Sequence, residues 1–126
     1  MIKYNLDPVF AQLREVMLNA AGSMQATVDE AGRLEMHASW AHPTKPGTQM
    51  WFGAVRMGKA YVSYHLMPVY THPKLAEAVD PALRRRMQGK SCFNFTSLDP
   101  ALMTALKALT QECDRAYAKP FQTRAP

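Results

Sequence analysis

The strongest constraint on this fold is an alternation of apolar and polar side chains on both sides of a turn that contains Gly32. Met24, Ala26 and Val28 alternate with polar residues before the turn, and residues 34–40 alternate in the same way after it. Successive side chains of a strand point to opposite faces of a sheet. The pattern therefore predicts a β-hairpin with one buried face.

Two more strands are predicted at residues 50–56 and 59–68, joined by a tight turn at residues 57–58. They are apolar on both faces, which is typical of the central pair of a sheet. Two short helical segments are predicted within residues 72–87, and an alternating fifth strand at residues 91–96. The middle of the chain thus holds four strands, a helical excursion and a fifth strand.

An aspartate followed by a proline opens a predicted helix near each end of the chain. Asp7 precedes a helix over residues 8–21, and Asp99 precedes a second helix over residues 100–118. In both places the carboxylate can accept hydrogen bonds from the free N–H groups of the first turn, and proline suits the first helical position. The second helix has an apolar stripe at helical spacing, which predicts its buried face. This stripe consists of Leu102, Leu106, Leu109, Cys113 and Tyr117.

The order of these elements predicts a single α+β domain over residues 1–120, followed by a flexible tail at residues 121–126. Helices at both ends of an antiparallel meander pack together on one face of its sheet. We therefore expect a two-layer sandwich with a five-stranded, mainly antiparallel sheet. The N- and C-terminal helices should cover one face and leave the other face open.

Composition narrows the class of protein. Hydrophobic residues make up 48% of the 126-residue chain and charged residues 20%, which is too apolar for a disordered protein. No apolar run approaches the roughly 18–20 residues of a membrane span, and the N-terminus lacks the apolar stretch of a signal peptide. Cys92 and Cys113 are too few for a disulfide framework. We expect a cytoplasmic protein with reduced cysteines and no membrane contact.

The net charge of +5 favours anionic partners. Three arginines at residues 84–86, with Lys90 close behind, could form a basic surface for a nucleic acid. A solvated turn whose arginines pair with Glu77 or Asp80 is the interpretation that we favour, so a nucleic-acid partner is not expected. Arg85 and Lys90 stay as candidates for binding an anionic group of a ligand.

The segment from residue 51 to residue 70 is rich in aromatic side chains. Because the helices can cover only one face of the sheet, part of this set should lie on the open face. An exposed aromatic patch marks a small ligand, a protein partner or a second copy in a homodimer. The alternative, that residues 69–90 fold over this face and bury it, stays open. The candidate binding residues are Trp51, Tyr61, Tyr64, His65, Met67, Tyr70, Arg85 and Lys90.

Alternation along the fourth predicted strand assigns its side chains to two faces. One set should project from the open face and the other should face the helices. The open-face set is Tyr61, His65 and Met67, and the helix-facing set is Val62, Tyr64 and Leu66.

Two segments resemble a known family. Trp51-Phe52-Gly53-Ala54, followed by residues 59–65, is similar to the central hairpin of the YdhG-like bacterial domain family. Residues 89–109, with a lysine before a short strand and then an Asp-Pro helix start, resemble its closing segment. Most members of this family have no known function.

The resemblance implies a frataxin-like sandwich, and some members of the family are described as iron chaperones. Iron handling of this type would need an acidic ridge, because hard iron ions prefer carboxylate oxygens. The first helix holds only Glu15 beyond its cap, and Asp29 and Glu30 lie in the predicted turn. We therefore predict no metal ligands and name no cofactor, and metal handling is the alternative function.

An enzyme built on Cys92 or His65 is a further alternative. Lys90 lies two residues before Cys92, and a nearby ammonium lowers the pKa of a thiol. His37 and His65 could approach each other only if their strands are neighbours and both side chains point the same way. The interpretation that we favour is a surface histidine at residue 37 and a hydrogen-bonded histidine at residue 65. The sequence offers no paired carboxylates and no glycine-rich phosphate loop, and a free cysteine is more often a small buried side chain. We therefore expect a binding domain rather than an enzyme.

Overall fold

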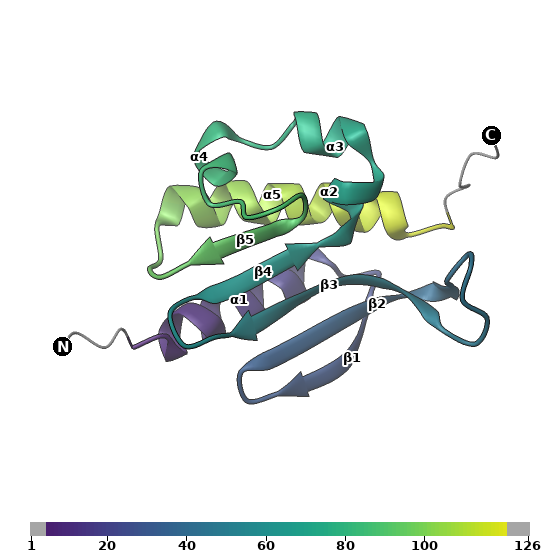
Figure 1. Ribbon diagram of the computed structural model, residues 1–126, viewed down its shortest axis with the longest axis horizontal. Helices are drawn as coiled ribbons and strands as arrows, with labels where there is room; N and C mark the ends of the chain where they lie inside the picture. Colours follow the sequence, from purple (N-terminus) through teal and green to yellow (C-terminus); the bar gives the residue numbers. More distant parts are fainter. Residues whose placement is uncertain (1–4, 121–126) are drawn as a thin grey trace.

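The predicted α+β sandwich is confirmed in a computed structural model that describes residues 5–120 (Figure 1). The tail predicted for residues 121–126 lies outside the described residues. The elements in chain order are α1 (Asp7–Ala20), β1 (Gln25–Glu30), β2 (Arg33–Ala41), β3 (Gln49–Met57), β4 (Val62–Leu66), α2 (Met67–Thr71), α3 (Pro73–Glu77), α4 (Pro81–Arg84), β5 (Cys92–Phe95) and α5 (Pro100–Tyr117).

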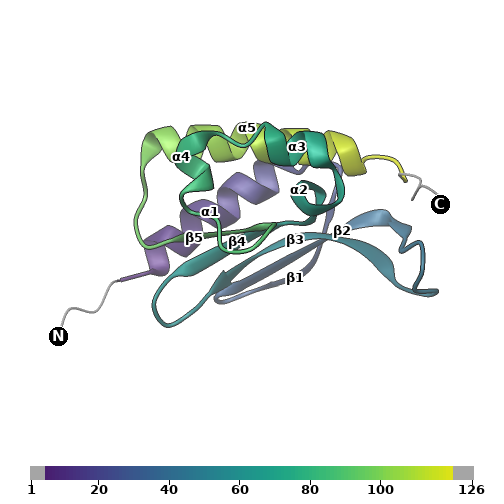
Figure 2. The same ribbon diagram turned by 45° about the horizontal axis from the view of Figure 1, so that its top comes forward.

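The five strands form an antiparallel meander in the order β1-β2-β3-β4-β5. Helices α1 and α5 pack against each other and cover one face of this sheet, as Figure 2 shows. The short helices α2, α3 and α4 contact α5 and lie in the same layer (Figure 2). The alternative that residues 69–90 cover the second face is therefore wrong, and among the described residues no helix lies over that face.

The core lies between the sheet and the two long helices, and its α5 stripe is buried as predicted. Tyr64 on β4 points into this core and is fully buried. Its hydroxyl lies 2.7 Å from Oγ1 of Thr110 on α5. The Thr110 hydroxyl in turn donates to the carbonyl oxygen of Leu106 at 2.8 Å, so the Tyr64 hydroxyl is the donor of the first bond. A polar link thus joins the central sheet to α5 inside the core.

The two Asp-Pro helix starts differ in the structure. Asp99 caps α5, because its Oδ1 accepts from the main-chain N–H of Ala101 at 2.9 Å. The same prediction for Asp7 is wrong. Helix α1 begins one residue earlier than expected, with Leu6 at the cap position and Asp7 inside the first turn. The Oδ1 of Asn5 accepts from the N–H of Asp7 at 3.2 Å, so the residue before the cap provides the polar contact.

The fourth strand is shorter than the predicted span of residues 59–68. Gly58 donates its N–H to the carbonyl oxygen of Tyr61 at 2.9 Å, which closes a loop before Val62. At the other end, Pro68 occupies an early position of α2 and stops the ladder. Tyr61 and Met67 therefore lie just beyond the two ends of β4, and neither belongs to its alternation.

A bulge in β3 changes which side chains share a face. Met36 is paired with Gly53, but the next residue of β2, His37, is paired with Trp51, so Phe52 is the extra residue. The Phe52 ring is buried and packs 6.0 Å from the Tyr117 ring of α5. Because a bulge shifts the alternation by one residue, Trp51 turns to the open face. A Cβ on Gly53 would collide with the carbonyl oxygen of His65, so this position needs glycine.

Candidate functional site on the open sheet face

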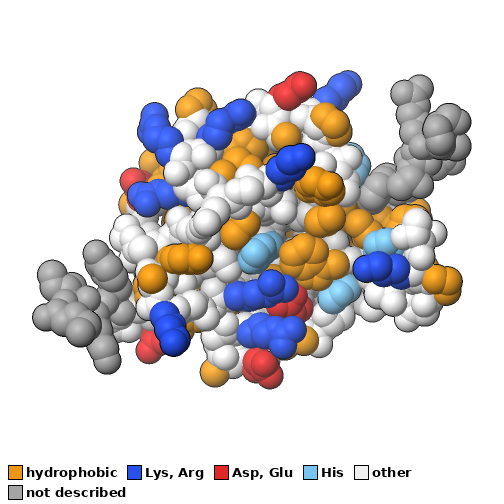
Figure 3. Space-filling model, viewed as in Figure 1, with side chains coloured by type: hydrophobic (Ala, Val, Ile, Leu, Met, Phe, Trp, Pro, Cys, Tyr) orange, Lys and Arg blue, Asp and Glu red, His pale blue; other side chains and the backbone are white. Residues whose placement is uncertain are grey.

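A buried carboxylate occupies the centre of the open face. Glu35 on β2 is only 4% exposed although no helix covers it in the described part of the chain. Arg56 of β3 donates from Nε to Oε2 at 2.7 Å and from Nη2 to Oε1 at 2.9 Å. Arg33 donates from Nε to Oε2 at 3.1 Å, and the Trp51 indole donates to Oε1 at 3.0 Å. Each carboxylate oxygen therefore accepts two hydrogen bonds, and Figure 3 shows basic side chains gathered around this point.

The pairing of β2 with β3 explains this cluster. Glu35 lies opposite Ala54, whose small side chain leaves room for neighbouring side chains to bend over the carboxylate. Arg33 lies directly opposite Arg56, and like charges at such a pair repel each other. The Glu35 carboxylate relieves that repulsion. We name Glu35, Arg33, Arg56 and Trp51 the Glu35 cluster.

The charge state of Glu35 follows from these contacts. Burial alone would raise the pKa of this carboxyl, but hydrogen bonds from Arg56, Arg33 and Trp51 lower the pKa to about 2. The carboxylate is therefore ionised at neutral pH, and two guanidinium groups against one carboxylate leave the cluster with one net positive charge.

Trp51 is held in place from two sides. Its N–H is bound to Glu35, and the Arg56 guanidinium carbon lies 5.6 Å from the ring centroid, within the range of a cation–π contact. The His65 ring lies 5.9 Å away at a tilted angle. A side chain fixed in this way loses little freedom when a ligand binds against it.

His65 and Cys92 lie side by side on β4 and β5. The Nε2 atom of His65 lies 3.9 Å from the Cys92 sulfur and 3.1 Å from the Ser63 hydroxyl oxygen. Burial raises the pKa of the Cys92 thiol, although Arg56 opposes this shift. Burial also lowers the pKa of His65, and Arg56 adds to that shift. Both directions favour a neutral thiol beside a neutral imidazole, whereas a nucleophile needs the thiolate.

Lys90 and His37 both lie away from this pair. The Nζ atom of Lys90, which would activate Cys92 in the enzyme alternative, lies 5.7 Å from the centroid of the Tyr70 ring. His37 lies on β2, and β3 separates it from the strand of His65. Its Nδ1 atom lies 2.6 Å from the Thr27 hydroxyl oxygen instead. The condition for a His37–His65 pair is therefore not met.

A hollow of about 220 Å³ lies beside Trp51 at one end of the open face. Its walls come from β2, β3, the first residue of α2 and the loop between β2 and β3. The loop is braced internally, because His42 donates its N–H to the carbonyl of Thr48 at 2.7 Å. The N–H of Thr44 also donates to Nδ1 of His42 at 3.1 Å. The residues that line the hollow are His37, His42, Lys45, Thr48, Gln49, Met50, Trp51 and Met67.

Three of the predicted binding residues lie at this site. Trp51 and Met67 line the hollow, and His65 contacts Trp51 on the open face, as expected for the fourth strand. Tyr64 is on the helix side, as its position in the alternation predicts, and its burial removes it from the candidate site.

The other four predicted residues lie away from this hollow. Tyr61 is 40% exposed in the loop before β4. Tyr70 is 55% exposed on α2 and is paired with Lys90. Arg85 borders a separate depression near the start of α5. The face that was expected to be aromatic is therefore largely polar around the Glu35 cluster, and Trp51 is the predicted aromatic residue that lines its hollow.

Glu35, Arg33, Arg56 and Lys45 were not predicted as site residues from the sequence. Glu35 and Arg56 occupy outward positions of predicted strands, where charged residues usually contact only solvent. The charged residues on the two neighbouring strands could have indicated the cluster. Such an inference needs the register of the strand pairing, because only the register shows which charges lie opposite each other. Lys45 lies in a loop that sequence alternation does not describe.

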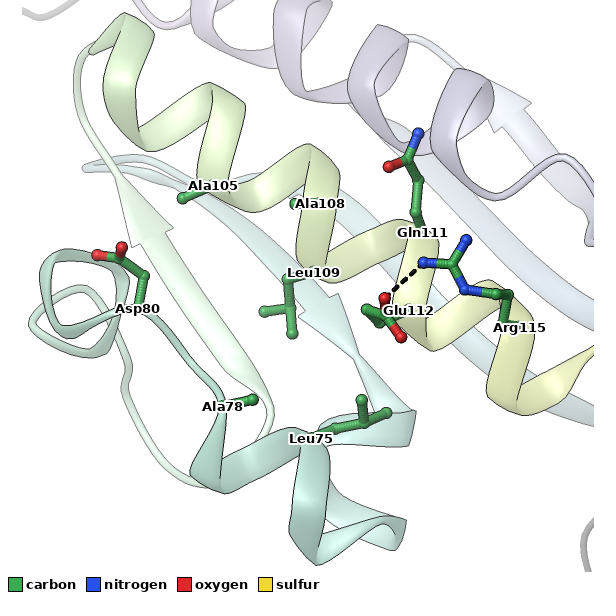
Figure 4. Close-up of a pocket in the computed structure, with 9 residues that line it drawn as sticks. All are labelled: Leu75, Ala78, Asp80, Ala105, Ala108, Leu109, Gln111, Glu112 and Arg115. Atoms are coloured by element: carbon green, nitrogen blue, oxygen red, sulfur yellow. Dashed lines mark hydrogen bonds and ion pairs between the residues drawn. The ribbon is translucent and has the colours of Figure 1, made fainter.

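A larger hollow of about 450 Å³ lies in the helix layer between the region of α3 and helix α5 (Figure 4). Leu75, Leu109 and several alanines form its apolar wall. Its charged side chains are already engaged, since Arg115 pairs with Glu112 and Asp80 accepts from the N–H of Ala82 at 2.8 Å. It offers apolar surface but little polar chemistry to orient a ligand.

Within residues 5–120, no three or more His, Cys, Asp or Glu side chains are grouped so that they could hold a metal ion. In the same range, no helix has both the length and the hydropathy needed to cross a membrane. The chain matches no known family model, no curated protein and no solved structure.

Proposed function

We propose that this protein is a small binding domain whose ligand lies against Trp51 in the hollow at the end of the open sheet face. The observation that carries this proposal is the fixed position of the indole. Glu35 and Arg56 hold Trp51 in place, and Trp51 also lines the hollow. A binding wall that is already ordered costs little entropy when the ligand arrives.

A binding role is supported over a catalytic one by the state of the candidate nucleophile. The pKa of Cys92 is raised by burial, and Lys90 contacts Tyr70 rather than the thiol region. Burial also lowers the pKa of His65, which favours its neutral imidazole form. An enzyme that uses Cys92 or His65 is therefore the weaker proposal.

Metal handling, which the resemblance to the YdhG-like family implies, is a second candidate with less support. Hard iron ions prefer carboxylate oxygens as ligands. The residues that line the hollow include two histidines but no carboxylate. Glu35, the carboxylate next to it, already accepts four hydrogen bonds from protein groups.

A second copy of the chain is also a poorer occupant than a small ligand. In a twofold dimer the same surface meets itself. Pairing of two open faces would bring Arg33 and Arg56 near their own copies, and each Glu35 cluster carries one net positive charge. We therefore expect a monomer in sedimentation experiments, whether or not a ligand is bound.

The two tryptophans allow a direct test by NMR. The full chain labelled with nitrogen-15 would be titrated with phenylacetate, phenylacetamide and phenethylamine, which share one aromatic ring. We expect at least one of them to shift the indole N–H signal of Trp51 and the amide signal of Thr48. The indole N–H of Trp40 donates to the carbonyl of Tyr117 at 2.8 Å, so its signal is the internal control and should not move.

The variant Trp51→Leu should lose these shifts, whereas Trp40→Phe should keep the shift of Thr48. If none of the three compounds moves Trp51 or Thr48, the proposed function is wrong. Shifts that are confined to residues around Leu75 and Leu109 would instead transfer the function to the hollow beside α5.

A further inference from the structure

We propose that the ligand of this hollow is a single aromatic ring with one carboxylate, and that Lys45 binds the carboxylate. This inference rests on the proposed function and adds the chemical class of the ligand. The size of the hollow, the kinds of side chain in its wall and the balance of charge around it all support this class of ligand.

The size of the hollow selects one ring. An engineered cavity of about 150 Å³ is large enough to hold benzene. The hollow beside Trp51 measures about 220 Å³, which leaves room for one ring and a short substituent. Sites for larger, drug-sized ligands start at roughly 300 Å³. A nucleotide or a peptide side chain with its backbone would extend well outside these walls.

The apolar part of the wall suits an aromatic ring. Trp51 offers the edge or face of an indole, and ring pairs of this kind gain energy beyond simple burial. Met50 and Met67 add thioether sulfur atoms, which make favourable contacts with ring edges and adapt to an irregular shape. These three residues lie on two separate elements, β3 and α2, so a ring between them would be enclosed from more than one side.

The polar part of the wall suits an anion. Lys45 is the cation among the eight lining residues, and none of those eight is acidic. His42 accepts a hydrogen bond at Nδ1 from the N–H of Thr44, so its Nε2 atom holds a proton and can donate it in a hydrogen bond. Behind Trp51, the Glu35 cluster has one excess positive charge and so adds no repulsion toward an anion.

A single ammonium group matches a single negative charge. Lysine acts as a flexible point charge, and it can follow a carboxylate without the fixed two-bond geometry that arginine requires. Lys45 lies on an exposed loop, so its contribution should be that of a partly exposed ion pair. We therefore expect selectivity for the anion to be modest in size and sensitive to salt.

The test compares the three ring compounds in one NMR titration of the full chain. We expect phenylacetate to bind about threefold to fivefold more tightly than neutral phenylacetamide, the ratio that one exposed ion pair supplies. Phenethylamine, which is a cation, should bind more weakly than either. In Lys45→Met, phenylacetate and phenylacetamide should bind equally, while the shifts of Trp51 and Thr48 persist.

Lys59→Met is the matched control, because Lys59 is also exposed but lies in the loop between β3 and β4. This variant should keep the full preference for phenylacetate. Equal binding of phenylacetate and phenylacetamide to the parent chain would overturn the inference about charge and leave the proposed function standing. A preference that survives in Lys45→Met would also overturn it, because the anion would then be bound by another group.

Discussion

The indole nitrogen of Trp51 lies 3.0 Å from Oε1 of Glu35, across the boundary between two neighbouring strands. This bond connects an outward-facing aromatic ring to the carboxylate of Glu35, which is buried on the open face. It exists because the bulge at Phe52 turns Trp51 toward that carboxylate. The Trp51 wall of the hollow and the charge network are therefore parts of the same local structure.

The Glu35 cluster should make stability depend on acid. The pKa of Glu35 is lowered from 4.5 to about 2 in the folded chain, so its stabilising effect is present above pH 4.5 and is lost as the pH falls toward 2. We expect this effect to be about 1–2 kcal/mol, because the two arginines are half exposed and screened. The free energy of unfolding in urea should differ less between pH 7 and pH 3 for Glu35→Gln than for the parent chain. Glu15→Gln, on the exposed side of α1, should behave like the parent, and an unchanged pH difference in Glu35→Gln would contradict this account.

Gly53 should tolerate no side chain. In Gly53→Ala the new Cβ would meet the main-chain carbonyl of His65, so β3 and β4 must move apart. We expect a loss of about 1–3 kcal/mol, the usual range for overpacking, measured as a lower urea midpoint. Gly22→Ala is the control, since its Cβ would meet no atom within 4 Å and its stability should change little. Equal midpoints for the two variants would show that the strands adjust freely.

Leu106 should be among the most costly residues to truncate. It is fully buried on α5, and Leu106→Ala should lower the free energy of unfolding by about 2–5 kcal/mol. Leu98→Ala removes the same atoms from a side chain that is 40% exposed and should cost much less. The urea midpoints of both variants provide the measurement, and a parent-like midpoint for Leu106→Ala would place the core elsewhere.

Asp99 and Asp7 provide a pair of contrasting helix starts. Asp99→Ala removes an acceptor for the N–H of Ala101 and should cost about 0.5–2 kcal/mol. Asp7→Ala removes no cap bond and should cost less, since only its attraction to the helix dipole is lost. Thermal unfolding of the two variants would show the difference, and both should keep the NMR shifts of Trp51 with phenylacetate. An Asp7→Ala variant as unstable as Asp99→Ala would contradict the observed start of α1.

The order of elements was predictable because strong local patterns specify it. Alternation around Gly32 and the stripe that includes Leu106 both describe faces that must be buried, and burial dominates folding energy. Local chemistry was less reliable where two nearby residues compete for one role. Asp7 has the preferred chemistry for a cap, but Leu6 occupies the cap position and Asn5 makes the contact.

The site was harder to predict because it depends on register. Alternation alone would group Trp51 with Val55, yet the bulge places Trp51 on the open face and leaves Val55 fully buried. Glu35 and Arg56 are apart in sequence and meet only when β2 and β3 are paired. No local pattern marks such a contact. The aromatic residues of the sequence predicted a binding face, but the predicted set held too many aromatic residues and omitted the charged residues around Glu35.

The extra residue in β3 also gives this chain an unusual way to lose its proposed binding site. A regular pairing of the same strands would set His37 opposite Phe52 and reverse the faces of the residues before it. Trp51 would then point inward, while Met50 and Phe52 would face solvent. No amino acid would have changed, but the hollow would lose the Trp51 wall of the proposed binding site. A distant relative could therefore diverge through slippage of one hairpin, and comparison of its residues one by one would miss the event.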